Sequence, residues 1–298
     1  MRQGNDNARL VRTSTFKAKP RIRALKWTQR KAWSRTLFTL LDDKLDGAVL
    51  AEIRRRDPEN LLDDDFSWLN ESVVTIKGSV QEDIPARFAI RLAEFYDGVV
   101  AFHGCRPLSL DSYKINGLKP SDTEAIRLQA KELFGDTAAL HKAILDVGPN
   151  YENHNRGVVW MCLAKESFLR GRQHDGYLLH GSEYLAAIAH RIGQTDKLRN
   201  LGVPTIIECF VCRSQLPPGF WLSLSRTLIE DWFARYLWPD RKRPVNTSCI
   251  NVKTTIPAHR ILKFHQFDEI RRLYWWGDFQ TGERKKAEAV HFRPRPAI

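Results

Sequence analysis

Side chains that could bind a ligand follow directly on the apolar segment VVAFHG. His103 and Gly104 close this segment, and Arg106 comes two residues later. A buried strand over residues 99–104 would hold the imidazole at its end, where a glycine lets a ligand approach the backbone closely. Such a pair suits hydrogen bonding to a ribose and an amide in a cleft. A histidine satisfied inside the fold, with a purely structural role, is the alternative.

Other familiar ligand motifs are missing from the sequence. The 298 residues hold neither GxGxxG nor GxxxxGK[ST], which argues against Rossmann and P-loop nucleotide sites. Cys209 and Cys212 form a CxxC, but residues three apart on a strand point to opposite faces. No second pair nearby completes a tetrahedral zinc site. We therefore expect buried thiols at this motif, and no bound metal.

Basic residues are concentrated at the two ends of the chain. Residues 1–35 carry 11 Lys and Arg against one acid, residues 271–298 carry seven against three, and the formal net charge is +12. Such ends attract a polyanion, so we expect a nucleic acid partner. Phe16, Trp27 and Trp33 could stack on its bases. Solvated tails, an anionic membrane surface, and aromatics that only dock the arm are the alternatives.

The pattern before residue 84 predicts a helical region behind a basic arm. Residues 34–57 show apolar side chains at helical spacing, with Ser34 as N-cap, which indicates one amphipathic helix. The segment VVTIKGSV, residues 73–80, favours a short strand. We assign residues 1–83 to this N-terminal region.

From residue 84 onward, short strands and helices alternate. Helices are expected over residues 84–98 and 121–135, the second with Ser121 and Glu124 as a capping box. The segments that favour strands are 99–104, 156–164, 175–180, 204–214 and 248–267, the last as a pair of strands broken at Pro257. Residues 146–157 are rich in Asn and favour a loop. The prediction is an α+β domain over residues 84–298, built on five or six strands and ending in a basic tail.

Three of these segments resemble, in order, motifs of the ADP-ribosyltransferase superfamily. VVAFHGCRPLSLDSYKINGLKPSD is similar to its opening motif: a strand, a His-Gly-x-Arg turn, a short helix and a Gly-Leu exit, forming one wall of the NAD pocket. GVVWMCLA resembles the second motif, and CINVKTTIPAHRILKF resembles the late strand with its Ile-Pro turn. The resemblance covers about residues 90–267 and implies a split mixed sheet with flanking helices. Cys105 stands where the superfamily usually has threonine.

This resemblance implies roles in binding NAD for four residues. His103 would hold the ribose, and Gly104 would bind the nicotinamide carboxamide through its backbone. Arg106 would reach the pyrophosphate, because a planar guanidinium matches paired oxygens. Trp160 would stack near the nicotinamide, with an ordinary core position as its alternative.

A catalytic carboxylate is missing from its usual place. The superfamily usually has a glutamate at the start of the late strand, where residues 246–248 read Asn-Thr-Ser. An anion is wanted there because breaking the ribose–nicotinamide bond develops oxocarbenium character. We expect Glu183, at a helix start, to act as the catalytic carboxylate beside His103, with Glu208 as second choice. The alternative for Glu183 is an acid that only complements the helix dipole.

Together these features predict an NAD-dependent ADP-ribosyltransferase that modifies a nucleic acid base, with NAD as donor and RNA placed ahead of DNA as acceptor. By analogy, such an enzyme would be a bacterial toxin or phage-defence effector with an antitoxin protein as partner. A protein acceptor, an NAD-dependent RNA 2′-phosphotransferase, and a non-catalytic nucleic-acid-binding protein with a relic pocket are the alternatives. The sequence has no stretch typical of a membrane helix or secretory signal, so we expect a cytoplasmic protein without membrane contact.

Overall fold

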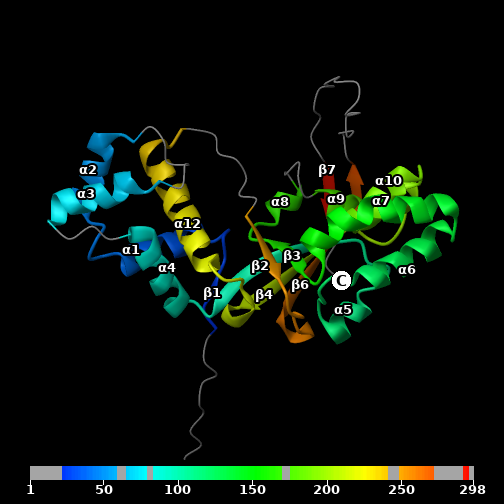
Figure 1. Cartoon of the computed structure of the whole chain (residues 1–298). Helices are drawn as coiled ribbons and strands as arrows, with labels where there is room; N and C mark the ends of the chain where they lie inside the picture. Colours follow the sequence, from blue (N-terminus) through cyan, green and yellow to red (C-terminus); the bar gives the residue numbers. More distant parts are fainter. Residues whose placement is uncertain are drawn as a thin grey trace, which may run out of the picture.

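A central sheet divides the protein into a helical lobe and a second group of helices (Figure 1). The computed structural model describes residues 22–58, 65–78, 83–169, 175–240, 248–271 and 291–294. The strands are β1 (Ala24–Leu25), β2 (Gly98–Cys105), β3 (Val159–Cys162), β4 (Thr205–Cys212), β5 (Cys249–Val252), β6 (Ile261–Arg271) and β7 (His291–Pro294). Their order in the sheet is β5-β3-β2-β4-β6-β7, with β1 paired to β2. The predicted α+β class is confirmed at this level: N-terminal helices and an antiparallel sheet with flanking helices.

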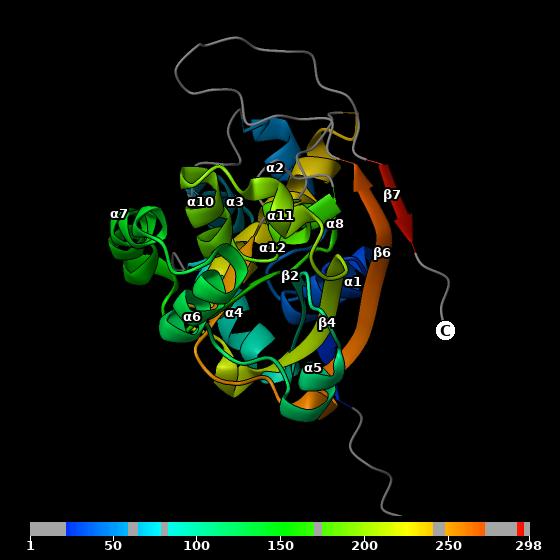
Figure 2. The same cartoon turned by 90° about the vertical axis from the view of Figure 1, so that its right-hand side faces the viewer.

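The two edges of β2 are used differently. Along one edge, β4 pairs antiparallel with all eight residues of β2, and Figure 2 shows β6 and β7 continuing the sheet beyond β4. The other edge is shared, because β1 pairs parallel with Gly98 and Val99 while β3 pairs antiparallel at Phe102 alone. The ladder between β2 and β3 thus ends before His103, and the sheet opens there.

The helical lobe contains more helices than the sequence pattern predicts. Its members are α1 (Arg30–Leu40), α2 (Gly47–Arg56), α3 (Ser67–Lys77), α4 (Ile84–Phe95) and α12 (Phe220–Leu237). The single helix predicted over residues 34–57 is wrong, because the Asp46 carboxylate accepts hydrogen bonds from the amides of Ala48 and Val49 and starts a new helix there. Ser34 lies inside α1 and caps nothing. The strand predicted at residues 73–80 is also wrong, since α3 runs to Lys77.

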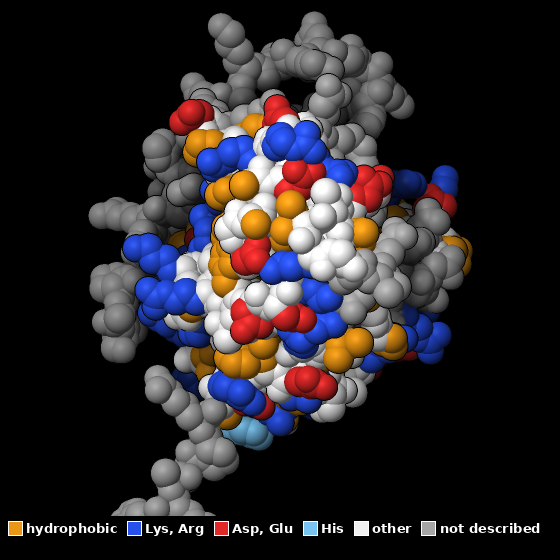
Figure 3. Space-filling model, turned by 90° about the vertical axis from the view of Figure 1, so that its left-hand side faces the viewer, with side chains coloured by type: hydrophobic (Ala, Val, Ile, Leu, Met, Phe, Trp, Pro, Cys, Tyr) orange, Lys and Arg blue, Asp and Glu red, His pale blue; other side chains and the backbone are white. Residues whose placement is uncertain are grey.

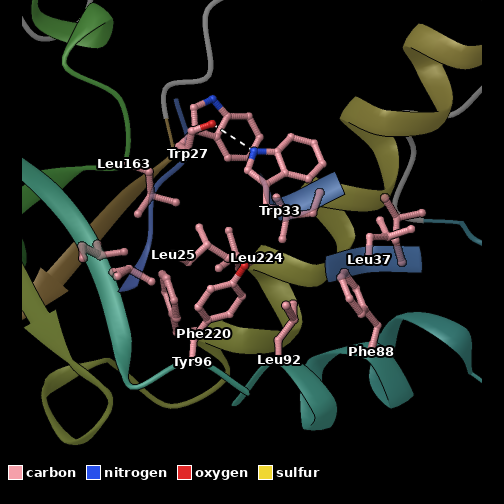
Figure 4. Close-up of a cluster of buried hydrophobic side chains, with 14 of the residues drawn as sticks. Leu25, Trp27, Trp33, Leu37, Phe88, Leu92, Tyr96, Leu163, Phe220 and Leu224 are labelled. Atoms are coloured by element: carbon pink, nitrogen blue, oxygen red, sulfur yellow. Dashed lines mark hydrogen bonds between the residues drawn. The ribbon is translucent and has the colours of Figure 1, made fainter. Parts of the chain in front are cut away.

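One apolar core joins this lobe to the sheet. Figure 4 shows side chains from β1, α1, α4 and α12 meeting, among them Leu25, Trp33, Phe88 and Phe220. The ring centroids of Trp27 and Trp33 are 5.8 Å apart, and the indole N–H of Trp33 donates a hydrogen bond to the backbone carbonyl oxygen of Trp27. Both tryptophans are buried, so they dock the chain on the body, which was the alternative to base stacking. Residues 1–21, with Phe16, and 272–290 lie outside the described residues.

The second group of helices flanks the other side of the sheet. It consists of α5 (Asp111–Asn116), α6 (Thr123–Phe134), α7 (Ala138–Asn155), α8 (Glu166–Leu169), α9 (Asp175–His180), α10 (Glu183–Arg191) and α11 (Thr195–Arg199). The loop predicted at residues 146–157 is wrong, since α7 continues through Pro149. The strand predicted at residues 175–180 is wrong too, because these residues form the short helix α9, whose Leu178 and Leu179 are buried. A short apolar run in the sequence fits a buried strand and a buried helix equally well.

Two further details of the fold bear on the predictions. The cap of α6 is Asp122, whose carboxylate accepts from the amides of Glu124 and Ala125, in place of Ser121. Of the helices in the ranges given above, none has the length and apolar character needed to cross a membrane.

Candidate functional site

A cavity opens where β2 and β3 separate, and we call it the His103 cavity. Its volume is about 180 Å³. The residues that line it are His103, Gly104, Trp160, Met161, Cys162, Phe168, Tyr177, Glu183 and Cys249. Four of the five predicted site residues therefore reach one cavity from three separate elements, β2, β3 and α10.

His103 is held in place by the open end of the sheet. Its Nδ1 lies 2.8 Å from the carbonyl oxygen of Trp160, which can only accept, so Nδ1 carries the proton. Burial lowers the pKa of His103, and the bond to Trp160 partly offsets this. The ring is therefore neutral at pH 7, and Nε2 is left as a hydrogen-bond acceptor.

Gly104 allows a close contact between β2 and the helices above it. A Cβ at this position would lie 2.8 Å from two ring atoms of Phe168 and 3.1 Å from Cβ of Tyr177. The rings of Phe168 and Tyr177 meet edge to face at 6.3 Å and form an aromatic wall of the cavity. The absence of a side chain at Gly104 is thus what lets this wall sit on the strand.

We expect Gly104→Ala to lower the free energy of unfolding by about 1–3 kcal/mol, because Phe168 is buried and must move. Chemical denaturation measures the change. Gly176→Ala is the matched control, since a Cβ there meets nothing within 4 Å and alanine favours a helix. Equal stabilities of Gly104→Ala and Gly176→Ala would contradict this account of the wall.

Trp160 contributes carbon surface to the cavity. It pairs with Asn251 of β5, and its side chain is half-buried. The indole Nε1 is sealed in protein without a hydrogen-bond partner among the described residues. The part of the ring that lines the cavity is therefore apolar, as a stacking role requires.

Glu183 lies at the rim of the cavity, in the first turn of α10. Ser182 caps this helix by accepting a hydrogen bond from the amide of Leu185. The Glu183 side chain is exposed and forms no ion pair with any residue that the structure describes. An unneutralised carboxylate thus stands beside an aromatic cavity, although its position also suits the helix dipole.

Arg106 is the predicted site residue that the structure does not bring to the cavity. Its guanidinium donates to four backbone carbonyl oxygens, those of Leu178, Arg199, Leu201 and Gly202, at 2.6 to 3.2 Å. Burial lowers the pKa of Arg106. With its donors committed to the chain, this guanidinium holds α9 and the segment after α11 against the end of β2.

A second cavity, the Glu208 cavity, lies on the same face of the sheet and has a volume of about 160 Å³. The residues that line it are Lys26, Trp27, Thr28, Gln29, Val100, Phe102, Lys165 and Glu208. Phe102, which lines the Glu208 cavity, belongs to the same buried cluster as Cys162 and Phe168, which line the His103 cavity.

Glu208, the second choice for the carboxylate, already has two partners, Lys26 and His265. Its oxygens lie 3.5 Å from Nζ of Lys26 and 3.0 Å from Nε2 of His265. Lys165 forms no ion pair with a described residue. The Glu208 cavity therefore offers one ammonium group that is free to bind an anion.

The two cysteines of the CxxC differ in their surroundings. Cys209 is buried, and desolvation raises its pKa to about 12. Cys212 is half-buried; burial acts to raise its pKa, but the hydrogen bond with Ser214 and the charge of Arg260, whose Nη1 is 2.8 Å away, outweigh it and lower the pKa. The expectation of buried thiols thus holds for Cys209 and is wrong for Cys212.

We expect iodoacetamide at pH 7 to alkylate Cys212 at least about tenfold faster than Cys209, because only the thiolate reacts. Peptide mapping by mass spectrometry after short exposures measures both rates. Arg260→Gln should slow the reaction at Cys212 by removing the nearby positive charge. Faster alkylation of Cys209 than of Cys212 would refute the assignment.

Metal-binding groups are not found in the described ranges, where no set of three or more His, Cys, Asp or Glu side chains could hold a metal ion. Residues 246 and 247, in the place of the usual glutamate, lie outside those ranges.

Comparisons with known proteins identify no relative of this chain. No family model, no curated protein and no solved structure matches it.

Proposed function

We propose that the chain is an NAD-dependent ADP-ribosyltransferase in which the His103 cavity receives the nicotinamide end of NAD. The observation that carries this proposal is the meeting of His103, Trp160 and Glu183 in one cavity. The three residues come from segments far apart in the sequence, and the resemblance to the ADP-ribosyltransferase superfamily assigns the first two to NAD. The opening of the sheet beyond Phe102 is consistent with the split sheet of that superfamily.

The size and lining of the cavity fit one ring. Pockets for drug-sized ligands typically measure about 300–1,000 Å³, so about 180 Å³ suits a single ring and not a whole dinucleotide. Trp160, Phe168 and Tyr177 offer aromatic surface for a flat heterocycle. The rest of the dinucleotide would extend out of the open cavity.

The polar groups fit the bond that must break. Nε2 of neutral His103 can accept a hydrogen bond from a ribose hydroxyl. As the ribose–nicotinamide bond breaks, its electron pair leaves with neutral nicotinamide, and positive charge develops on the ribose. The exposed carboxylate of Glu183 would stabilise that charge, and the acceptor then forms the new bond at the same carbon.

A nucleic acid acceptor is supported by the neighbouring cavity and by the basic ends. Lys165 of the Glu208 cavity lies three residues before Phe168 of the His103 cavity, forms no ion pair with a described residue, and could bind a phosphodiester. On the face of the helical lobe in Figure 3, basic and acidic side chains are interspersed. Attraction for a polyanion would therefore come from the basic ends of the sequence rather than from that face.

The test is incubation of the whole chain with labelled NAD and, in turn, RNA, DNA and a cell lysate. We expect release of nicotinamide together with label on RNA. Label on DNA or protein would keep the transferase and replace the acceptor. Absence of both nicotinamide release and transfer would overturn the proposal and leave a nucleic-acid-binding protein.

His103→Ala tests whether the His103 cavity is the site. We expect a loss of nicotinamide release of about a hundredfold, because the variant removes the ribose contact at the reacting centre. His259→Ala is the matched control, as this histidine is exposed and belongs to neither cavity. Full activity in His103→Ala would place the reaction elsewhere.

A further inference from the structure

Two thiols stand side by side in the wall of the His103 cavity. Cys162 ends β3, Cys249 begins β5, and the two residues are direct cross-strand partners in the antiparallel ladder. Their sulfur atoms are 3.2 Å apart, and both side chains line the cavity. The chain thus holds a dithiol within the proposed NAD site.

The strand positions of this pair are compatible with a disulfide. Directly opposed residues in antiparallel strands have Cα atoms about 4.5 or 5.5 Å apart, and disulfides span about 4.4–6.8 Å. The sulfurs need to approach by only about 1 Å to reach the bond length of about 2.05 Å. Cys105 and Cys209, in contrast, lie in the core on the other face of the sheet.

The two thiols differ in protonation and in access. The hydrogen bond with Cys249 and burial raise the pKa of Cys162, so Cys162 keeps its proton and can donate it to the Cys249 sulfur. Cys162 is buried, whereas Cys249 is half-buried. A small oxidant in the cavity therefore meets the Cys249 sulfur first.

We infer that Cys162 and Cys249 form a reversible redox couple that regulates the His103 cavity. Hydrogen peroxide transfers one oxygen to the Cys249 sulfur, which becomes a sulfenic acid, and the other oxygen leaves as water. The Cys162 sulfur then attacks the Cys249 sulfur, its proton joins the departing hydroxyl as a second water, and the S–S bond forms. The two thiols supply two electrons to the peroxide, and dithiothreitol returns them.

The disulfide should change the cavity because it fixes β3 to β5 two residues from Trp160. A covalent link between the strands stiffens this wall, so that its side chains can no longer adjust as a ring binds. We expect NAD turnover by the oxidised protein to fall several-fold and to recover with dithiothreitol. This activity readout rests on the proposed function, whereas formation of the disulfide does not.

The test treats the whole chain with hydrogen peroxide, followed by peptide mapping without reductant. We expect one main cross-linked peptide pair, joining Cys162 to Cys249, that disappears with dithiothreitol and is missing in Cys162→Ser and Cys249→Ser. Cys105→Ser should form the link at the unmodified rate. Mapping that finds only other pairs, or only sulfinic and sulfonic acids at Cys249, would overturn the inference.

A second measurement needs no oxidation and covers the case in which the serine variants fold poorly. Phenylarsine oxide releases one water as it bridges two neighbouring thiols through arsenic. We expect one arsenical per chain, bound across Cys162 and Cys249, and protection of this pair from peroxide. Failure of the unmodified chain to bind it would count against an accessible dithiol. If the disulfide forms while NAD is never consumed, the redox couple stands and the proposed function fails.

Discussion

Arg106→Ala is expected to lower the free energy of unfolding by about 3 kcal/mol or more, which makes it the most destabilising single substitution that we predict. The variant removes a guanidinium that donates to four backbone carbonyl oxygens. A hydrogen bond from a charged donor contributes about 1.5–3 kcal/mol, and each buried carbonyl left without a partner costs about 1–3 kcal/mol. The bonds share one group and do not add fully, so the sum overstates the effect.

The packing around Arg106 indicates that nothing can replace it. Gly202 adopts φ +61°, and a Cβ there would lie 2.5 Å from the carbonyl oxygen of Arg106, so this segment is pressed against the backbone of residues 106 and 107. Arg106→Lys should recover only part of the stability, since one ammonium cannot reach carbonyls on several sides.

Chemical denaturation followed by circular dichroism measures these losses. Arg213→Ala is the matched control, because that half-exposed guanidinium donates to a single carbonyl, that of Tyr96, and should cost less than about 1 kcal/mol. If Arg106→Ala proves as stable as Arg213→Ala, the carbonyl cluster does not hold the fold. In that case the role expected from the resemblance, in which Arg106 binds the pyrophosphate, would be tested next.

The fate of Arg106 shows what the sequence could and could not predict. The strand before it follows from its local pattern. The resemblance leads us to expect His103 and Trp160 in one pocket, and we choose Glu183 for its place at a helix start. The partners of Arg106, however, lie at residue 178 and residues 199–202. No local pattern links residues so far apart, because the tertiary fold alone brings them together.

The other discrepancies have two distinct causes. The helix start at Asp46 could have been predicted, since Asp is a preferred N-cap residue, but the apolar spacing on both sides of it indicated one continuous helix. The thiol pair was not readable, because a cross-strand contact depends on register and β3 and β5 are separated by most of the helices around the site. Local signals of the first kind can be sought in other chains, whereas the second kind requires a structure.

Glu183→Gln is expected to slow nicotinamide release by about a hundredfold or more while leaving the fold intact. The substitution keeps the shape of an exposed side chain and removes only its charge. Losing one group that stabilises charge in a transition state typically costs about 10²–10³ in kcat. Losing an acid from the first turn of α10 costs about 0.3–1 kcal/mol of stability, too little to explain such a fall.

Glu124→Gln provides the matched control for this charge. It also removes a first-turn acid, from α6, but its partner is Arg127 and it does not line the His103 cavity. We expect its kcat to stay within about twofold of the unmodified protein, because no transition-state charge lies near it. Single-turnover assays with labelled NAD separate the chemical step from binding in both variants.

Equal rates for the two variants would remove Glu183 from the reaction and make Glu208 the carboxylate to test, although Lys26 and His265 already engage it. A slow Glu183→Gln beside a fast Glu124→Gln would tie the effect to the His103 cavity, since both variants lose the same charge from the first turn of a helix.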